Sequence, residues 1–172
     1  MNLNSFIRDI PDFPKKGILF KDITTLLSDK NAFNHTIEIF KNKYKSLKIN
    51  KIVGIETRGF ILGAPLANAL KCGFIPIRKK GKLPYKTYSE SYKLEYGTDC
   101  LEVHTDALKD NENVVLIDDV LATGGTAKAS IKLIKRFNVN LVECAFLIEL
   151  LELKGNKKIF SENKKYHSII KI

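Results

Sequence analysis

Short apolar runs alternate with longer amphipathic segments along much of the chain. An apolar run of about four to eight residues between turn residues is typical of a buried strand, whereas apolar positions at about every third or fourth residue are typical of a helix. Strands that alternate with helices form parallel sheets whose two faces are covered. The sequence therefore predicts an α/β fold with a central parallel sheet flanked by helices. The predicted strands are 51–55, 74–77, 114–117 and 141–147, and the predicted helices are 31–47, 60–70 and 125–137.

Two segments depart from this alternation. Residues 81–106 are rich in Tyr, Lys, Ser and Glu and alternate only weakly, which favours a hairpin or a mobile flap. The tail 157–172 is basic at first and ends in the strand-like run HSIIKI, and the pattern assigns it no role. The chain of 172 residues shows no internal repeat and no low-complexity linker, so we expect a single domain, 1–172.

Composition places the chain among ordinary globular proteins, with 44% apolar and 28% charged residues. No apolar run reaches the roughly 18 residues of a membrane span, and the N-terminus lacks the basic start and apolar stretch of a secretory signal. Cys72, Cys100 and Cys144 are far apart and odd in number, which is typical of reduced cytosolic thiols. No Cys or His pair has metal-ligand spacing. These features predict a cytoplasmic protein with no membrane partner.

The formal net charge of +10 invites comparison with nucleic-acid-binding proteins. However, the lysines are scattered along the whole chain, whereas a nucleic-acid site more often has a basic stripe with interleaved aromatic residues. We therefore expect no nucleic-acid partner. The one dense basic run, 78–82 (RKKGK), follows a strand-like segment, and composition alone is equally consistent with an anion-binding loop and with a solvated turn.

The clearest candidate for chemistry is the stretch VVLIDDVLATGGT at 114–126. In an open α/β sheet, ligands bind beyond the carboxyl ends of the strands, where this stretch has two acids and then a turn into a helix. Backbone N–H groups at a helix start bind phosphate, and carboxylates accept hydrogen bonds from hydroxyls. A ribose 5-phosphate therefore fits. The acids are Asp118 and Asp119, and the turn residues are Ala122, Thr123, Gly124, Gly125 and Thr126.

Other interpretations of this stretch explain less. A plain strand-to-helix turn accounts for the glycines but leaves the acid pair unexplained. The patterns GxxxxGK[ST] and GxGxxG are missing from the chain, which argues against a P-loop hydrolase and a dinucleotide-binding fold. A phosphoacceptor receiver domain also has acids at strand ends, but it would not explain the Gly-Gly-Thr entry to the helix.

VVLIDDVLATGGT resembles the motif that binds phosphoribosyl pyrophosphate (PRPP) in the type I phosphoribosyltransferases. Four other segments narrow the resemblance to the adenine phosphoribosyltransferase family. They are DFPKKGILFKDIT at 12–24, GIETRGFILGAPLA at 54–67, PIRKKGKLP at 76–84 and YKLEYGTDCLEVHTDAL at 92–108. The resemblance covers most of the chain. It implies the type I fold, with a small N-terminal hood in residues 1–30 and a flexible flap in residues 81–106.

The resemblance also implies a reaction, in which adenine and PRPP give AMP and pyrophosphate. Mg²⁺ would be carried by PRPP and pyrophosphate, without direct protein ligands. The turn 122–126 would bind the 5-phosphate, and the acid pair would lie near the ribose hydroxyls. Pyrophosphate would meet a loop and two further cations. These residues are Glu56, Thr57, Arg58 and Gly59 in the loop, and Arg78 and Lys82 beyond it. On charge alone, Arg58 could instead be a structural ion-pair residue, although this interpretation is the less favoured one.

By the same resemblance, the hood covers the base. Leu19 would offer backbone hydrogen bonds to adenine, and Leu150 would pack on the opposite ring face, although sequence alone favours core leucines at both positions. Lys21 belongs to this hood, but many family members carry Arg there, so we assign it no Arg-specific contact. In the flap, Glu95 matches the proposed acid/base residue, and Tyr96 would close over the sugar. The family is typically a homodimer.

Two alternatives remain. A guanine- or hypoxanthine-specific transferase would have the same fold, but 6-oxopurines reverse the donor and acceptor at the purine 6-position. A non-catalytic PRPP or nucleotide sensor that regulates nucleic acid would require an added DNA-binding segment, which we do not expect here. The presence of Arg58 and Glu95 also argues against a sensor.

Overall fold

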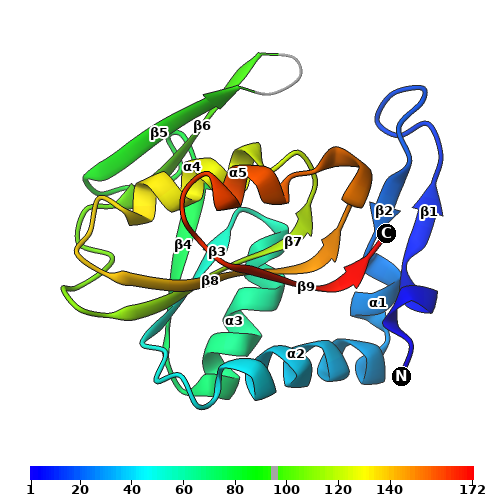
Figure 1. Ribbon diagram of the computed structural model, residues 1–172, viewed down its shortest axis with the longest axis horizontal. Coiled ribbons are helices and arrows are strands. Elements are labelled where there is room, and N and C mark those ends of the chain that lie inside the picture. Colours follow the sequence, from blue (N-terminus) through cyan, green and yellow to red (C-terminus); the bar gives the residue numbers. More distant parts are fainter. Residues whose placement is uncertain (94–96) are drawn as a thin grey trace.

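The computed structural model describes residues 1–93 and 97–172 of the chain (Figure 1). The strands are β1 (Arg8–Ile10), β2 (Phe20–Asp22), β3 (Lys51–Ile55), β4 (Gly73–Lys79), β5 (Thr87–Lys93), β6 (Thr98–His104), β7 (Asn113–Leu121), β8 (Asn140–Glu149) and β9 (Tyr166–Lys171). The helices are α1 (Thr24–Ser28), α2 (Lys30–Tyr44), α3 (Arg58–Leu70), α4 (Gly125–Ile134) and α5 (Asn156–Phe160). Short 3-10 helices span Leu3–Phe6 and Leu151–Leu153.

Over the described residues, a seven-stranded sheet runs through the molecule in the order β5-β6-β4-β3-β7-β8-β9. The five neighbouring strands β4, β3, β7, β8 and β9 pair in parallel. β6 pairs antiparallel with β4 and with β5. The β5–β6 hairpin therefore extends one edge of a parallel sheet. It lies within the segment 81–106, for which a hairpin or flap is predicted. A second, two-stranded sheet pairs β1 with β2.

Helices cover both faces of the parallel sheet. Figure 1 shows α4 and α5 on one side of it and α2 and α3 on the other. Successive strand residues point to opposite faces, so neighbouring side chains enter different apolar layers. In β7, Leu116 is buried in the layer with α4 and α5, and Ile117 is buried in the layer with α2 and α3. With both faces covered, the carboxyl ends of the strands remain as the edge where a ligand can bind.

β7 is longer than its apolar run predicts. The predicted strand stops at Ile117, but its pairing with β8 continues to Leu121, which lies opposite Glu149. Asp118 and Asp119 therefore lie inside the strand near its carboxyl end, and the strand ends directly before the predicted turn 122–126. The backbone pairing, which the sequence pattern does not display, extends the strand through the acids.

The predicted helices are confirmed, with shifted ends. α3 begins at Arg58, ahead of the predicted start, so that Arg58 belongs to the first turn of the helix. α2 ends at Tyr44 and α4 at Ile134, both before their predicted ends. At the end of α4 the chain tightens into a 3-10-type turn, in which the Phe137 N–H donates to the Ile134 carbonyl at 3.1 Å.

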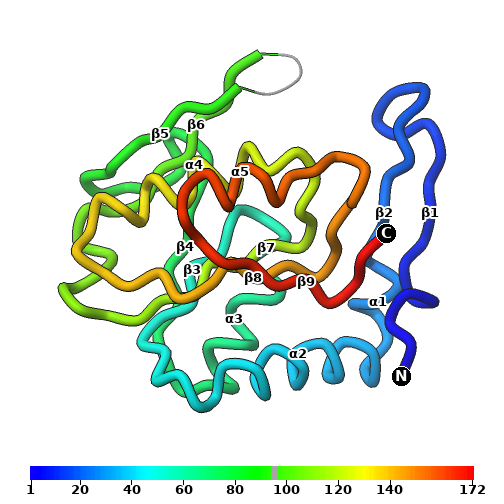
Figure 2. The backbone as a smooth tube through the Cα atoms, viewed as in Figure 1, coloured from blue at the N-terminus to red at the C-terminus, as the bar shows by residue number. Residues whose placement is uncertain are grey.

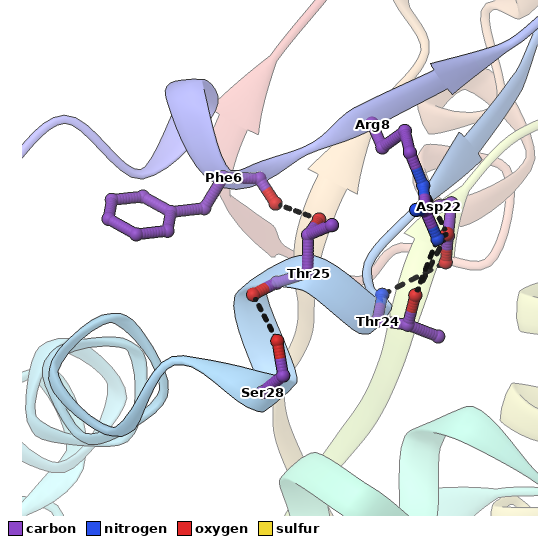
Figure 3. A network of polar contacts seen from close by, with 6 residues as sticks. All are labelled: Phe6, Arg8, Asp22, Thr24, Thr25 and Ser28. Carbon is purple, nitrogen blue, oxygen red and sulfur yellow. Dashed lines mark hydrogen bonds and ion pairs between the residues drawn. The ribbon is translucent and has the colours of Figure 1, made fainter.

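The hood contains a hairpin that the apolar pattern does not reveal. In it, Arg8 lies opposite Asp22, and Asp9 lies opposite Lys21. The Asp22 carboxylate accepts hydrogen bonds from the Thr24 N–H at 2.9 Å and from Arg8 Nε at 3.0 Å (Figure 3). Polar contacts between side chains thus fix the hairpin to the start of α1.

The C-terminal tail completes the sheet. β9 contains the strand-like run predicted near the C-terminus, and it pairs in parallel with β8. The tube in Figure 2 shows the chain returning along β8 and ending near β2. There the Leu151 N–H donates to the Ile172 carbonyl at 2.8 Å. The tail thus has a structural role as the outermost strand of the parallel sheet.

Candidate active site

A cavity of about 470 Å³ opens at the carboxyl ends of β3, β7 and β8, where ligands of α/β sheets bind. Its walls come from the hood, the loop after β3, the β7–α4 turn and the β5–β6 hairpin. These segments are far apart in sequence, and the fold brings them together. The predicted site residues that line the cavity are Leu19, Lys21, Glu56, Thr57, Arg58, Asp118, Asp119, Ala122, Thr123, Gly124, Gly125, Thr126 and Leu150.

The turn between β7 and α4 depends on two glycines in contact. Gly124 has a φ of +74°, a left-handed conformation that favours glycine. A Cβ atom on Gly124 would lie 2.4 Å from the Gly155 carbonyl oxygen, and one on Gly155 would lie 2.2 Å from the Ala122 carbonyl oxygen. The turn thus packs backbone to backbone on Gly155. Because α4 begins at Gly125, its first N–H groups and the positive end of its dipole can bind a phosphate here.

The acid pair lies beside this turn and contacts the start of α3. The Asp119 N–H donates to Asp118 Oδ1 at 2.9 Å. Arg58 Nε lies 2.8 Å from Asp119 Oδ2, a close charge contact that lacks hydrogen-bond geometry. Asp118 Oδ1 lies 3.1 Å from the position of a Cβ atom on Gly59, so the missing side chain of Gly59 lets α3 approach the acid pair.

Both carboxyl groups are held in surroundings that oppose their ionisation. Burial and the neighbouring charge of Asp119 raise the pKa of Asp118 well above its usual value. Burial also raises the pKa of Asp119, although the charge of Arg58 opposes that rise. Hydroxyl donors placed against the pair would stabilise the ionised form. The pair is therefore suited to a ligand with neighbouring hydroxyl groups.

Glu56 gathers the basic residues at the other end of the cavity. Its side chain is 4% exposed, and it forms ion pairs with Lys82 and with Arg78, whose Nε lies 3.3 Å from Oε2. The same Oε2 accepts a hydrogen bond from the Lys79 N–H at 2.9 Å. Burial opposes ionisation of Glu56, but these hydrogen bonds outweigh it and lower the pKa of the carboxyl group. The acid therefore holds the cations in place.

The hood presents apolar side chains to the cavity. Leu19 is 48% exposed and lines the cavity. The ring centroid of Phe20 lies 5.2 Å from Arg58 Cζ, a cation–π contact that links the hood to α3. Lys21 Nζ bonds Asp9 Oδ1 at 2.7 Å, so its ammonium group is already paired across the hairpin.

Known proteins share this arrangement over nearly the whole chain. The family described as phosphoribosyl transferase domain matches residues 22–171. Adenine phosphoribosyltransferase of Halothermothrix orenii is 60% identical over 159 residues, which are 92% of this chain and 94% of the relative. The chain belongs to the adenine phosphoribosyltransferase family.

Solved structures of adenine phosphoribosyltransferases have the same fold. The structure from Thermoanaerobacter pseudethanolicus superposes with a TM-score of 0.94 at 49% identity, covering 99% of this chain and 98% of that one. The structure from Saccharomyces cerevisiae, solved with adenine and D-2,5-dideoxy-2,5-imino-altritol 1,6-bisphosphate, gives a TM-score of 0.92 at 38% identity, covering 96% and 95%. The predicted type I fold, with a mostly parallel sheet flanked by helices, is confirmed.

Not every predicted site residue of this adenine phosphoribosyltransferase family member lines the cavity. Of those that the structure describes, Gly59, Arg78 and Lys82 lie outside its lining. Gly59 lies in the first turn of α3 and is buried against β7, and the two cations lie against Glu56. Glu95 and Tyr96 fall outside the described residues, so their predicted roles stay predictions.

The structure adds residues that sequence reasoning missed. Phe20 stands inside the quoted hood segment, and its apolar character beside Lys21 is a signal that could have found it. Gly155 follows the apolar residues of 141–153. The local sequence does not indicate that Gly155 contacts the β7–α4 turn, because that contact joins distant parts of the chain. The other added lining residues are Ile18, Lys79, Tyr92, Asp99, Leu101, Val120, Leu121, Ala127, Phe146 and Leu153.

The described residues provide neither a metal cluster nor a membrane span. Residues 1–93 and 97–172 contain no cluster of three or more His, Cys, Asp or Glu side chains that could hold a metal ion. Over the same residues, no helix combines the length and the apolar character needed to cross a bilayer.

Proposed function

We propose that this protein transfers the 5-phosphoribosyl group of PRPP to adenine, giving AMP and pyrophosphate, as the adenine phosphoribosyltransferase family does. The observation that carries the proposal is one cavity that is lined by an apolar hood, by an acid pair beside a glycine-rich turn, and by the cations Arg58 and Lys79. A purine, a ribose 5-phosphate and a pyrophosphate each have a matching surface there. The reaction belongs to purine salvage.

The base occupies the hood end. The side chains of Leu19 and Phe20 on one side and of Leu150 on the other offer apolar surface to the two faces of adenine. Backbone groups of Leu19 bind the adenine edge and distinguish it from 6-oxopurines, because the donor and acceptor at position 6 are exchanged between the two. The ammonium group of Lys21 stays with Asp9.

The ribose 5-phosphate occupies the β7–α4 end. The phosphate accepts hydrogen bonds from the N–H groups of 122–126 and from the hydroxyls of Thr123 and Thr126. The ribose hydroxyls donate to Asp118 and Asp119, which relieves the cost of ionising two buried acids side by side.

Pyrophosphate leaves toward the cations. Arg58 and the backbone of the loop from Glu56 to Gly59 meet the leaving group, and Arg78 and Lys82 add positive charge. Glu56 keeps these side chains ordered before PRPP arrives, so that less side-chain entropy is lost on binding. As the C1′–oxygen bond to pyrophosphate breaks, negative charge develops on the leaving group, where fixed cations stabilise it most.

Purine N9 forms the new bond to C1′ and must lose its proton. Glu95 is the acid/base group that takes it, and Tyr96 closes the flap over the sugar. Closure excludes water, which would otherwise hydrolyse a C1′ centre with oxocarbenium character. Mg²⁺ bound to PRPP would supply further stabilisation of the charge on the phosphate groups, and we assign it no direct protein ligand.

The wider assignments belong to the same proposal. Residues 1–172 work as one catalytic domain, with the hood and the flap as its two closing parts. The protein is a cytoplasmic homodimer with no nucleic-acid or membrane partner, and its three cysteines are free thiols in the structure. Light scattering on the purified protein measures the dimer, and a monomeric mass would contradict it.

The deciding experiment is turnover of labelled adenine with PRPP and Mg²⁺. We expect AMP and pyrophosphate in equal amounts, with adenine used far better than hypoxanthine or guanine. Removing Mg²⁺ with a chelator stops turnover and leaves the protein folded. Glu95→Gln is the matched variant, and its single-turnover rate should fall by about a hundredfold or more. No AMP from the wild type, or equal use of 6-oxopurines, would refute the assignment.

A further inference from the structure

Three side chains near the loop end of the β5–β6 hairpin form a polar bridge along one wall of the cavity. Tyr92 on β5 lies directly opposite Asp99 on β6. The Tyr92 hydroxyl donates to Asp99 Oδ2 at 3.3 Å, and the same oxygen lies 3.0 Å from Lys79 Nζ at the end of β4. All three residues line the cavity, and none of them was singled out from the sequence.

One end of the bridge lies against the phosphate-binding turn. Tyr92 Cδ2 is 3.5 Å from the position that a Cβ atom on Gly125 would take. The Tyr92 ring therefore lies close to Gly125, the first residue of α4. Burial raises the pKa of the Tyr92 hydroxyl, and the Thr126 side chain partly opposes the rise. Tyr92 is therefore neutral near pH 7, and its hydroxyl can act as a donor.

The other end of the bridge reaches the cation cluster. Hydrogen bonding with Asp99 raises the pKa of Lys79, so Lys79 is an ammonium group paired with a carboxylate. The backbone N–H of Lys79 donates to Glu56, which also holds Arg78 and Lys82. The bridge thus connects the turn for the 5-phosphate with the acid that orders the pyrophosphate cations.

We propose that Tyr92 is a positioning residue that sets the spacing between the 5-phosphate and pyrophosphate subsites. This inference rests on the proposed function for the identity of the two subsites. PRPP carries a phosphate at each end and must fit both subsites at once, whereas AMP occupies only one of them. A fixed spacing therefore favours PRPP and is nearly neutral for AMP.

Tyr92→Phe tests the bridge because it removes the hydroxyl and keeps the ring against the turn. Calorimetry without adenine should show PRPP affinity weakened by roughly three- to tenfold, the effect of about one hydrogen bond. AMP affinity should stay within about twofold, since AMP does not span both subsites. In steady-state assays KM for PRPP should rise while kcat stays within about twofold, a split that a general loss of folding would not produce.

Two further variants isolate the hydroxyl. Tyr88→Phe is the matched control, because Tyr88 lies on the same strand but packs on Phe137 with 5.3 Å between ring centroids. It should bind PRPP as the wild type does. In an Asp99→Ala background, Tyr92→Phe should change PRPP affinity by less than about twofold, because the hydroxyl acts through Asp99.

Each outcome decides the point. Unchanged PRPP affinity in Tyr92→Phe, or an equal loss of PRPP and AMP affinity with a lower melting temperature, would make Tyr92 a packing residue only. A full effect in the Asp99→Ala background would also reject the bridge. A wild type that binds PRPP but does not convert adenine would remove the proposed function, and the binding comparison would still decide the bridge.

Discussion

At the scale of single residues, the acid pair lowers the stability of the fold and favours the binding of a ligand. Asp118 and Asp119 are adjacent in a strand, and burial raises the pKa of both. A protein selected only for stability would place apolar residues at these positions, because burying two charges side by side is costly. Arg58 forms an ion pair with Asp119, and its charge offsets the cost of burying the two acids only in part. The remaining cost is recovered when a hydroxyl-rich ligand donates hydrogen bonds to the pair.

The double substitution Asp118→Asn with Asp119→Asn separates these two effects. We expect PRPP affinity and turnover to fall by at least about tenfold, because each lost charge-assisted hydrogen bond is worth about 1.5–3 kcal/mol. Thermal stability should stay equal or rise, because the repulsion between the buried acids is removed. Calorimetry and a melting curve measure the two quantities. Wild-type turnover would exclude the proposed role, and an unfolded variant would make the acids structural.

A second test at this scale concerns Gly155, which contacts the turn across the fold. In Gly155→Ala the new methyl group would lie 2.2 Å from the Ala122 carbonyl oxygen, so the backbone of the turn must move. Because the proposed phosphate site consists of backbone N–H groups, AMP affinity should fall by at least about tenfold. Gly73→Ala is the control, since its methyl group would lie 3.2 Å from the flexible side chain of Lys51 and at an ordinary 3.7 Å from the Asn50 carbonyl oxygen. Unchanged AMP binding in Gly155→Ala would mean that the turn does not hold the phosphate.

At the scale of elements, polar contacts tie the β1–β2 hairpin of the hood to α1, whereas Leu3, Ile23 and Leu26 of the hood are buried in the core. The backbone N–H of Thr24 and the side chain of Arg8 hold the pKa of Asp22 at about 2, below its usual value of 3.8. The Thr25 hydroxyl donates to the Phe6 carbonyl, which adds a second tie between the hood and α1 (Figure 3). A short hairpin of three-residue strands has little other support.

This network predicts a pH-dependent contribution to stability. A carboxyl group whose pKa is lowered by folding stabilises the native state fully above its unfolded pKa, and the stabilisation disappears as pH falls through the folded value. Asp22→Asn should therefore cost about 1 kcal/mol of unfolding free energy near neutral pH. The difference from the wild type should shrink between pH 3.8 and about pH 2. Denaturant titrations at several pH values measure it, and a difference independent of pH would show that the Asp22 charge does not anchor the hood.

Elements with strong apolar patterns were predictable, and those held by distant pairs were not. The central strands and α2, α3 and α4 follow from their periodicity because burial against a sheet is what the pattern records. The hood hairpin was not predicted from its pattern, because it depends on pairs such as Arg8 with Asp22. Within the site, the turn 122–126 and the acids were predictable from local chemistry. Tyr92 and Gly155 were not, because their contacts form only when separate elements meet.

At the scale of the whole molecule, the cavity is an assembly of parts that fold far apart in sequence. The hood, the loop after β3, the β7–α4 turn and the β5–β6 hairpin each supply one wall. Figure 1 places the hood and the β5–β6 hairpin at opposite sides of the carboxyl edge of the sheet. A ligand that contacts several walls should therefore raise the stability of the fold more than a ligand that contacts only one wall.

Thermal shifts with AMP test this assembly. In the proposed function AMP reaches from the hood to the turn 122–126. At a concentration of about 100 times Kd it should therefore stabilise the fold by about 2.7 kcal/mol. For a chain of this size, each kcal/mol raises the melting temperature by roughly 2–4 °C. Adenosine lacks the phosphate and GMP lacks the 6-amino group, so at the concentration of AMP both should give much smaller shifts. Gly155→Ala should lose the AMP shift because its turn is displaced.

Equal shifts with AMP and GMP would mean that the hood does not recognise adenine. Equal shifts with AMP and adenosine would mean that the turn does not bind the phosphate.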